Sequence, residues 1–399
     1  MNEQIKKRIS AINIGIIPDG YKKTKVGIVP AEWEIKTLAE LCEISAGGDI
    51  EKKHCQTTPN EKFKFPVYSN ALTNKGLYGY SDIFKISEKT VTVTGRGEIG
   101  YAIARNEKYY PIVRLLVLKP KNENINTVFL AHQINESKIY IESTGVPQLT
   151  APQLSLLKIF CPSLKEQIII AEILSTQDKL IELKQKLIDL KKQQKKWLMQ
   201  NLLTGKIRLK GFDGEWSHQK FKDVCTFING RAYKQDELLN IGKYKVLRVG
   251  NLFTNGEWYY SDLDLSDDKY IDNGDLIYAW SASFSPYIWN GGKAIYHYHI
   301  WKIDRLVNIN KTFLFLFLQY DVDNIKSETQ GGTMSHITKE TMEKRSIIFP
   351  SLSEQTAIAE ILSHQDKEID LLEKELELQK QKKKALMQLL LTGKVRVST

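Results

Sequence analysis

The sequence predicts two mixed α/β domains joined by two long helices that pair as an antiparallel coiled coil. Three observations lead to this prediction: the chain length, a long segment that occurs twice, and a composition typical of folded domains. A chain of 399 residues exceeds one compact core and suits two domains of ordinary size. Hydrophobic residues make up 42% of the chain and charged residues 26%, as in globular domains.

The most informative feature is the internal repeat. Residues 162–209 recur as residues 350–397, with 31 of 48 positions identical. A weaker repeat places Glu32, Trp33, Cys42 and Gly47 in register with Glu215, Trp216, Cys225 and Gly230. Globular regions and repeated elements therefore alternate, and their cyclic order predicts a pseudo-twofold arrangement.

The repeat divides the chain into four parts. We expect a first domain over residues 1–162, a first long helix over 163–205, a second domain over 206–350 and a second long helix over 351–399. Each helix should act as a spacer between the domains. Because a whole domain follows the first helix instead of a short turn, the cyclic order favours an antiparallel pair.

Both repeated elements carry helix signals from end to end. A serine and a glutamate at capping-box spacing open each one, and a glycine follows each one. At 1.5 Å per residue the uninterrupted segment gives a rod of about 55–60 Å. Apolar positions step by three and four residues, as a coiled-coil seam requires. The expected seam residues are Leu180, Leu183, Leu187, Leu190, Ile369, Leu372 and Leu376.

Two alternatives concern these helices. They could be independent core helices of their domains, although near-identity on every face favours identical partners on both copies. The lysines Lys191, Lys192, Lys195 and Lys196 are expected on a solvated face that complements the helix dipole, with DNA contact as the alternative.

The regions between the repeats predict strands and helices in alternation. Strand-like stretches, separated by Gly, Asn and Asp, cover residues 89–94, 112–118, 244–249, 275–280 and 293–303. Helical patterns cover residues 126–140 and 310–319. Each region is therefore expected to form an α/β domain of about 150 residues.

Motifs for catalysis are missing or stand in the wrong context. Residues 95–100 fit the glycine pattern of dinucleotide sites, but a strand-like stretch follows where a helix is needed. Asp49, Glu51 and Lys53 resemble a nuclease trio, yet they stand in a turn-rich stretch. His297 and His299 are expected on one face of a half-buried strand. We expect no catalytic site and no metal.

Cysteines and charge bear on surroundings and partners. The four cysteines are scattered, without zinc-ligand or disulfide spacing, which fits a reducing cytoplasm. No apolar run approaches the roughly 20 residues of a membrane span. The net charge of +10 is compatible with a polyanionic partner such as DNA.

The ends of the two repeats carry the most specific motifs. Residues from Pro162 and from Pro350 follow P-S-L-x-E-Q-x-x-I-A-E-I-L-S-x-Q-D-K, and each copy closes with L-L-T-G-K-[IV]-R. With Trp33, Trp216 and the stretch 274–281, this organisation resembles the specificity subunit of type I restriction-modification systems over essentially the whole chain.

The resemblance implies a non-catalytic subunit that reads DNA. Each domain would read one half of a bipartite, asymmetric site in double-stranded DNA, and the helices would set the spacing and dock two methyltransferase subunits. Two restriction subunits could join the complex. S-adenosylmethionine would belong to the methyltransferase, and ATP and Mg²⁺ to the restriction subunit.

Candidate site residues follow from the chemistry of base reading, in which Arg suits guanine and Asn or Gln suits adenine. The DNA-binding candidates are Asn70, Lys75, Arg96, Arg105, Arg231, Arg248, Asn251, Trp280 and Ser283. The candidates for methyltransferase docking are Glu166, Gln167, Glu354 and Gln355.

Three other functions compete with this interpretation. A duplicated DNA methyltransferase or nuclease lacks its motifs here. A coiled-coil scaffold without a DNA role leaves the basic charge and the domain resemblance unexplained. A methylation-only complex without a restriction motor is compatible with the sequence. The bases read and the spacer length do not follow from the residues.

Overall fold

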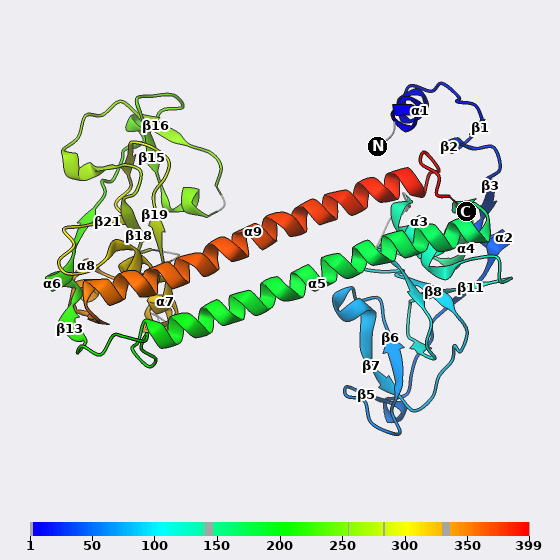
Figure 1. Cartoon of the computed structure of the whole chain (residues 1–399), viewed down its shortest axis with the longest axis horizontal. Helices are drawn as coiled ribbons and strands as arrows, with labels where there is room; N and C mark the ends of the chain where they lie inside the picture. The colour runs from blue at the N-terminus through cyan, green and yellow to red at the C-terminus, as the bar shows by residue number, and fades with distance from the viewer. Residues whose placement is uncertain are drawn as a thin grey trace. The chain divides into compact units, whose positions relative to one another are not determined.

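The computed structural model describes residues 3–137, 139, 147–253, 255–281, 284–328 and 336–398 (Figure 1). The chain divides into two units: the first comprises Met1–Gln185 with Glu375–Thr399, and the second comprises Lys186–Lys374. Helices α5 (Leu164–Leu202) and α9 (Leu352–Leu390) each contribute one half to each unit. A unit therefore combines one globular region with half of each long helix. Both helices lie inside the ranges that the repeat predicts.

The first unit contains four shorter helices, two 3-10 turns and twelve strands among the described residues. The helices are α1 (Glu3–Asn13), α2 (Leu38–Leu41), α3 (Thr127–Glu136) and α4 (Ala151–Ser155), and the 3-10 turns are η1 (Lys52–His54) and η2 (Thr73–Gly76). The strands are β1 (Tyr21–Thr24), β2 (Gly27–Pro30), β3 (Glu34–Thr37), β4 (Cys42–Ala46), β5 (Cys55–Gln56), β6 (Phe65–Tyr68), β7 (Leu77–Ser81), β8 (Thr90–Val93), β9 (Ala102–Arg105), β10 (Tyr110–Pro111), β11 (Leu116–Pro120) and β12 (Lys158–Cys161).

Two four-stranded sheets form the globular part of the first unit, in the orders β4-β11-β8-β9 and β10-β6-β7-β5. Helix α3 packs on β8 and β9. Its start is capped by Asn126, whose Oδ1 accepts a hydrogen bond from the Phe129 amide. Val91, Leu118 and Leu130 are buried in the core between sheet and helix.

The second unit contains three shorter helices, three 3-10 turns and ten strands within the described ranges. The helices are α6 (Phe221–Val224), α7 (Lys311–Glu328) and α8 (Lys339–Lys344), and the 3-10 turns are η3 (Gln235–Glu237), η4 (Val249–Leu252) and η5 (Asp267–Lys269). The strands are β13 (Ser217–Lys220), β14 (Thr226–Asn229), β15 (Tyr244–Leu247), β16 (Tyr259–Ser261), β17 (Tyr270–Ile271), β18 (Leu276–Ala279), β19 (Ser285–Ile288), β20 (Ala294–Tyr296), β21 (Ile300–Asp304) and β22 (Ser346–Phe349).

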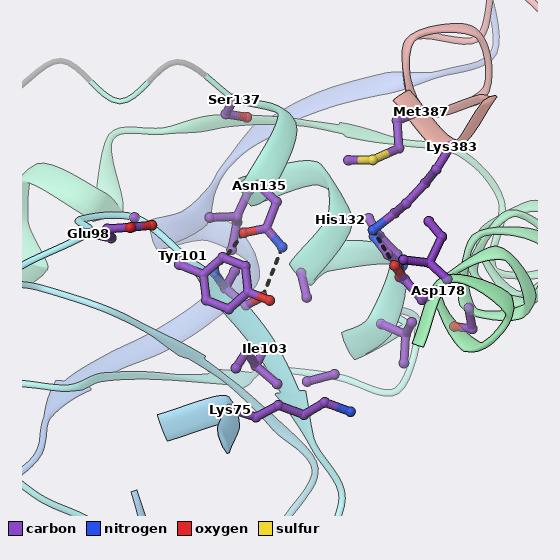
Figure 2. A pocket seen from close by; sticks show the side chains of 18 of the residues that line it. Lys75, Glu98, Tyr101, Ile103, His132, Asn135, Ser137, Asp178, Lys383 and Met387 are labelled. Carbon is purple, nitrogen blue, oxygen red and sulfur yellow. Dashed lines mark hydrogen bonds and ion pairs between the residues drawn. The ribbon is translucent and has the colours of Figure 1, made fainter. Parts of the chain in front are cut away.

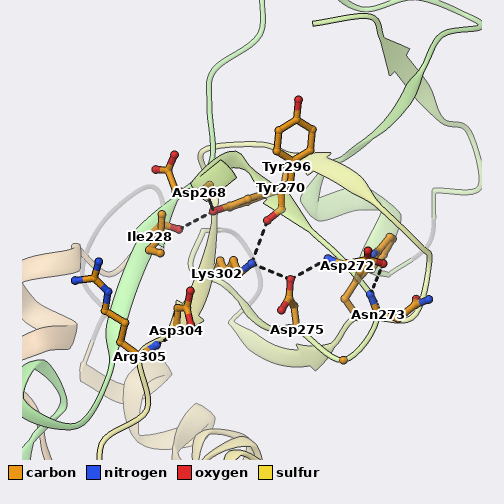
Figure 3. A network of polar contacts seen from close by, with 12 residues as sticks. Ile228, Asp268, Tyr270, Asp272, Asn273, Asp275, Tyr296, Lys302, Asp304 and Arg305 are labelled. Atoms are coloured by element: carbon orange, nitrogen blue, oxygen red, sulfur yellow. Dashed lines mark hydrogen bonds and ion pairs between the residues drawn. The ribbon is translucent and has the colours of Figure 1, made fainter. Parts of the chain in front are cut away.

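The second unit repeats the sheet plan with the orders β14-β21-β18-β19 and β16-β15-β20-β17. Half-buried polar contacts join its two sheets (Figure 3). Lys302 on β21 donates to the Tyr270 carbonyl oxygen at 3.2 Å and pairs with Asp275 at 3.0 Å. The Tyr296 hydroxyl on β20 donates to the carbonyl oxygen of Asp268 at 2.7 Å. The Lys302 contact ties β21 of one sheet to β17 of the other, and the Tyr296 contact ties β20 to the 3-10 turn η5 that precedes β17.

The two globular parts share one backbone register around that turn. Gly47 donates to the Leu115 carbonyl oxygen as Gly230 donates to that of Ile300. A Cβ atom on Gly47 would lie 2.5 Å from the Ile112 oxygen, so only glycine allows this close approach. A Cβ on Gly230 would lie 2.3 Å from the oxygen of Tyr296. The weak sequence repeat therefore marks a real structural correspondence.

The halves of α5 and α9 run antiparallel within each unit. In the first unit Lys184 pairs with Glu375 at 2.5 Å, and Asp178 pairs with Lys383 further along. In the second unit Lys191 pairs with Glu368 and Lys195 with Asp366, at 2.7 and 2.6 Å. Lys191 and Lys195 are therefore half-buried in interhelical ion pairs, which corrects the prediction of a solvated face for these two, whereas Lys192 and Lys196 are exposed as predicted.

The predicted seam is right on α9 and wrong on α5. Ile369 and Leu376 are buried and Leu372 is half-buried, as expected. On α5 the side chains that face α9 instead begin with Leu174 and Gln177 and continue through Ile188. The four predicted leucines of α5 are 37–61% exposed: Leu180, Leu183, Leu187 and Leu190. The polar residues on the buried face of α5 hide its periodicity in the sequence.

The predicted fold class is confirmed: two mixed α/β regions are connected by two long helices. Two predicted strands differ from the structure at a functionally important place. The stretch 293–303 forms two strands, β20 and β21, separated by residues 297–299. Likewise, residues 112–115 form a turn before β11 and not the start of a strand. Both breaks occur because the backbone crosses from one sheet to the other.

Candidate DNA-reading loops and the closure of each unit

Each unit is closed by a buried glutamate at the start of a long helix. Glu166 is 1% exposed and accepts hydrogen bonds from Arg396 at 2.6 and 3.0 Å. It also accepts one from the Trp33 indole at 3.0 Å. In the second unit Glu354 is 1% exposed and accepts two hydrogen bonds from Arg208, both at 2.7 Å. The segment that follows one long helix is therefore tied to the start of the other in both units.

The neighbouring glutamines close the units in the same way. Gln167 accepts a hydrogen bond from the Asn126 amide and donates to the Pro162 carbonyl oxygen. Gln355 accepts from the Asn310 amide and donates to Pro350. All four predicted docking residues are thus buried and engaged inside their own unit. The prediction that Glu166, Gln167, Glu354 and Gln355 form a docking surface is wrong, because no partner can reach them.

Two loops of the first unit bring a pair of arginines together. Arg96 lies in the β8–β9 loop and Arg114 in the turn between β10 and β11. The Gln148 side-chain oxygen accepts hydrogen bonds from Arg96 at 3.2 and 3.3 Å and from Arg114 at 2.6 Å. Both arginines are exposed. Arg96 was predicted, whereas Arg114 and Gln148 were missed because the sequence suggests a strand at one and no pattern at the other.

The same loops of the second unit carry aromatic and imidazole side chains. Trp280 donates its indole hydrogen to the Tyr298 carbonyl oxygen at 2.8 Å, and its ring lies 5.2 Å from that of His299. Residues 297–299 form the turn between β20 and β21. His297 and His299 therefore lie in a turn and not on a strand face, which corrects the sequence-based expectation.

A cavity of about 440 Å³ adjoins this turn. Its lining includes Tyr233, Arg248, His297 and His299. Burial lowers the pKa of His297 to about 4, with His299 and Arg248 adding to the effect, and burial also lowers the pKa of His299. Both imidazoles are therefore neutral near pH 7, when each can donate one hydrogen bond and accept another.

The other predicted DNA residues of the second unit are partly engaged. Arg231 forms a two-point ion pair with Glu237 at 2.7 and 3.0 Å, so its charge is neutralised locally. Asn251 donates to the carbonyl oxygens of Asn255 and Glu257 and shapes its own loop. Arg248 lies over the Tyr259 ring, 4.9 Å from its centre. Ser283 lies outside the described residues.

Three residues of the first unit that were predicted to bind DNA differ widely in exposure and in their contacts within the chain. Asn70 accepts a hydrogen bond from the Gly95 amide and so supports the β8–β9 loop. Lys75 is exposed and pairs with Glu182 at 3.3 Å. Arg105 is 4% exposed, donates to Thr92 and to the Lys75 carbonyl oxygen, and stacks 3.5 Å above the Tyr68 ring. The structure corrects the prediction for Arg105, which is an internal brace.

A larger cavity of about 890 Å³ lies in the first unit between β9, α3 and the long helices (Figure 2). His132 on α3 faces Asp178, with 3.7 Å between Nε2 and the carboxylate, and Lys383 pairs with the same carboxylate. Burial lowers the pKa of His132 to about 4 against the opposing effect of Asp178. This side chain is therefore neutral near pH 7.

The described residues hold no cluster of three or more His, Cys, Asp or Glu side chains arranged for a metal. None of the helices in the same ranges combines the length and apolar character that a membrane crossing requires. What the geometry offers is a pair of loop sites, each on a rigid two-sheet framework, with arginine, glutamine, histidine and tryptophan side chains. These features define the chain as a two-domain binding scaffold suited to nucleic acid.

Comparison with known proteins identifies the family. Residues 30–192 and 213–380 match the type I restriction modification DNA specificity domain. The chain belongs to this family and carries two target-recognition domains, as the sequence resemblance predicts. The two matches begin near Trp33 and Trp216 and include most of α5 and α9.

Relatives of similar length support the assignment. A putative type I restriction enzyme MjaX specificity subunit from Methanocaldococcus jannaschii is 25% identical, over 96% of this chain and 98% of its own. The MjaVIII specificity subunit of the same organism is 26% identical, over 92% and 94%. The crystal structure of a type I S subunit from M. genitalium shares the fold, with a TM-score of 0.62 at 16% identity over 92% of this chain and 96% of that one.

Proposed function

We propose that this chain reads a bipartite DNA site for a type I restriction-modification complex, one half-site per unit, and contributes no catalytic group. One observation carries the proposal. The two units repeat the same backbone register and the same buried closure, yet they present different side chains on the same loops. A shared framework with different reading residues is suited to two different half-sites.

The reading chemistry supports DNA over a protein partner. The first unit presents two exposed arginines held by one glutamine, and the second presents neutral histidines beside a tryptophan. Base edges in the major groove are read by such donors and acceptors, while phosphate contacts provide position. The net charge of +10 favours association with the polyanionic duplex.

We further propose that methyltransferase subunits dock on exposed leucines of the long helices. In the first unit Leu183 of α5 is 51% exposed and Leu378 of α9 is 62% exposed. The equivalent leucines of the second unit are Leu371 and Leu190, each 61% exposed. Each unit thus exposes the same two leucines, one from each helix, and the repeat makes the two pairs equivalent. Equivalent apolar positions favour two copies of one partner.

In this proposal the cofactors are bound by the partner subunits and not by this chain. S-adenosylmethionine would be held by the methyltransferase subunits, and ATP and Mg²⁺ by restriction subunits where a complex has them. A methylation-only complex would leave the role of this chain unchanged. The helices, 39 residues each, would set the gap between half-sites through their length, about 58 Å at 1.5 Å per residue.

Methylation mapping tests the reading role. DNA from cells that express this chain with its methyltransferase should show a new methyladenine motif in two blocks separated by a gap of fixed length. Cells that express the methyltransferase alone should lack it. No new motif from a complex that assembles would exclude the reading role.

Native mass spectrometry of the assembled complex tests the docking surface. The Leu183→Glu/Leu378→Glu variant should lose one methyltransferase copy, and so should Leu190→Glu/Leu371→Glu, because each adds two charges to one apolar contact. Leu352→Glu is the matched control, since Leu352 is 50% exposed but lies at the first residue of α9, away from these pairs. Retention of both copies by both double variants would exclude these leucines as the docking surface.

A further inference from the structure

The backbone register makes individual loop positions of the two units equivalent. Ile112 donates to the Tyr68 carbonyl oxygen, and His297 donates to that of Leu247, both at 2.9 Å. Each of these two turns then closes in the same way: Leu115 donates to the oxygen of Ile112 as Ile300 donates to that of His297. Residues 112–114 therefore correspond to residues 297–299, and Arg114 corresponds to His299.

A second pair of hydrogen bonds aligns the remaining loops. Leu149 donates to the Gly95 carbonyl oxygen at 2.9 Å, and Ile337 donates to that of Trp280 at 3.3 Å. The positions beside these bonds, Arg96 and Gln148, therefore correspond to Ser281 and His336. Contacts across the loops agree: Arg96 bonds to Gln148, and Ser281 forms a β-bridge with His336.

These positions form one triplet in each unit. The first triplet is Arg96, Arg114 and Gln148, and the second is Ser281, His299 and His336. The framework beneath them is shared, from the tight glycine contacts to the buried closure of the helices. The side chains at all three positions differ. This combination, a constant scaffold with three variable positions on adjacent loops, is what the reading of two different sequences requires.

The charge of the first triplet indicates its ligand. Both guanidinium groups share the Gln148 oxygen, and in the described part of the chain neither has a carboxylate within 4.0 Å. Two positive charges are therefore held close together without an acidic partner among the described residues. Most of their N–H donors remain available, since an arginine has five. An acceptor-rich ligand fits this arrangement, and among base edges guanine presents two acceptors, O6 and N7, in the major groove.

We propose that Arg96, Arg114 and Gln148 read a guanine-containing half-site, and that Ser281, His299 and His336 are the matching specificity-determining positions for the other half-site. This inference rests on the proposed function, because it names the residues through which each unit would read DNA. It assigns specificity to three residues per unit, and of these six only Arg96 is a DNA-binding candidate from the sequence.

The chemistry of the second triplet differs in kind. His299 is held neutral by burial, which lowers its pKa, and a neutral imidazole both donates and accepts hydrogen bonds. Serine has the same double capacity. The second triplet therefore has no fixed positive charge at the position of Arg114. Replacing His299 by arginine places a guanidinium at the equivalent point of the other unit.

The test uses the whole chain with its methyltransferase and maps methylated genomic sites. Arg96→Ala and Arg114→Ala should each relax one position of one half-site, with base discrimination there falling ~10- to 100-fold, the value of one two-point base contact. His299→Arg should change the other half-site alone. Lys89→Ala is the matched control, since Lys89 is exposed beside the opposite end of β8 and should leave the motif unchanged.

Outcomes separate the triplets from the reading role itself. If an arginine variant lowers methylation equally at every site and leaves the motif unchanged, the proposal is overturned, because the arginines would then contribute to affinity alone. Arg114→Lys retains the charge but not the two-point geometry, so a relaxed motif supports the proposal and an unchanged motif opposes it. Absence of any motif with the unaltered chain would reject the proposed function and not merely the triplets.

Discussion

The first and second units reach the same closure by different covalent routes. In the second unit Arg208 follows α5 directly along the chain and binds Glu354 at the start of α9. In the first unit Arg396 follows α9 and binds Glu166 at the start of α5, 230 positions earlier in the chain. The cyclic order inferred from the repeat therefore has a physical basis, since in both units the segment after one long helix binds the start of the other.

The two closures differ in the hydrogen bonding of their tryptophans. The Trp33 indole donates to Glu166 and is 1% exposed, whereas the Trp216 indole nitrogen is buried without a hydrogen-bond partner in the described part of the chain. The first unit thus gains a hydrogen bond that the second lacks.

Removing the buried glutamates should give the largest effects. Glu354→Ala leaves Arg208 without its buried acid, and Glu166→Ala leaves Arg396 with only the exposed Glu32, each at a cost of about 3 kcal/mol, the lower end for buried pairs. The lower end applies because Arg396 and Arg208 remain 31% and 29% exposed to water. Glu166→Ala should cost about 1 kcal/mol more, since it also leaves the Trp33 indole unpaired.

Hydrogen exchange in urea, read separately for each unit, measures these losses. Glu32→Ala is the control: Glu32 contacts the same Arg396 at 3.2 Å but its side chain is 81% exposed, so the change should be under about 1 kcal/mol. Equal losses in the two units would mean that the Trp33 bond contributes nothing to the difference.

The sequence predicts the framework of this protein better than its sites. Repeats, helix caps and apolar periodicity are patterns of residues close together in the sequence. These patterns predict α5, α9 and the division into two globular regions. The seam of α5 was misplaced because Gln177 and Lys184 lie where apolar residues were expected, engaged with Gln379 and Glu375. These two interhelical partners are 202 and 191 positions away in the chain, so no local pattern reveals them.

The candidate site was partly predicted because some of its chemistry is local. Arg96, Arg248 and Trp280 lie beside glycines and turns: Arg96 and Trp280 are in the loops that follow β8 and β18, and Arg248 lines the cavity beside His297. Glu166 and Glu354 have the same capping-box position that marks an exposed helix start, yet both are buried by a distant arginine. Arg114 and His299 were missed because β-branched and aromatic neighbours favour a continuous strand. The expected strand is interrupted in the structure because the backbone crosses there from one sheet to the other.

A histidine distinguishes the packing under α3 from that under α7. His132 is 8% exposed and corresponds to Leu316, because Asn126 and Asn310 cap these helices in the same way. The surrounding ion pairs are equivalent as well: Asp178 with Lys383 in the first unit matches Asp366 with Lys195 in the second. The imidazole in place of a leucine gives the packing under α3 an acid-sensitive group that the packing under α7 lacks, whereas the acid-sensitive His297 of the second unit lies in the turn before β21.

The sign of this pH dependence follows from the pKa of His132, which burial lowers from 6.5 to about 4 in the folded chain. The unfolded chain binds the proton more tightly, so stability is full above about pH 6.5 and falls as the pH drops toward 4. Between pH 7 and 5.5 the first unit should lose about 1 kcal/mol. The His132→Leu variant, which copies the second unit, should remove this loss in urea unfolding followed by hydrogen exchange. Leu316→Ala, a matched core change without a titrating group, should lower stability equally at both pH values. If His132→Leu retains the pH dependence of the first unit, then other groups of that unit cause it and not His132.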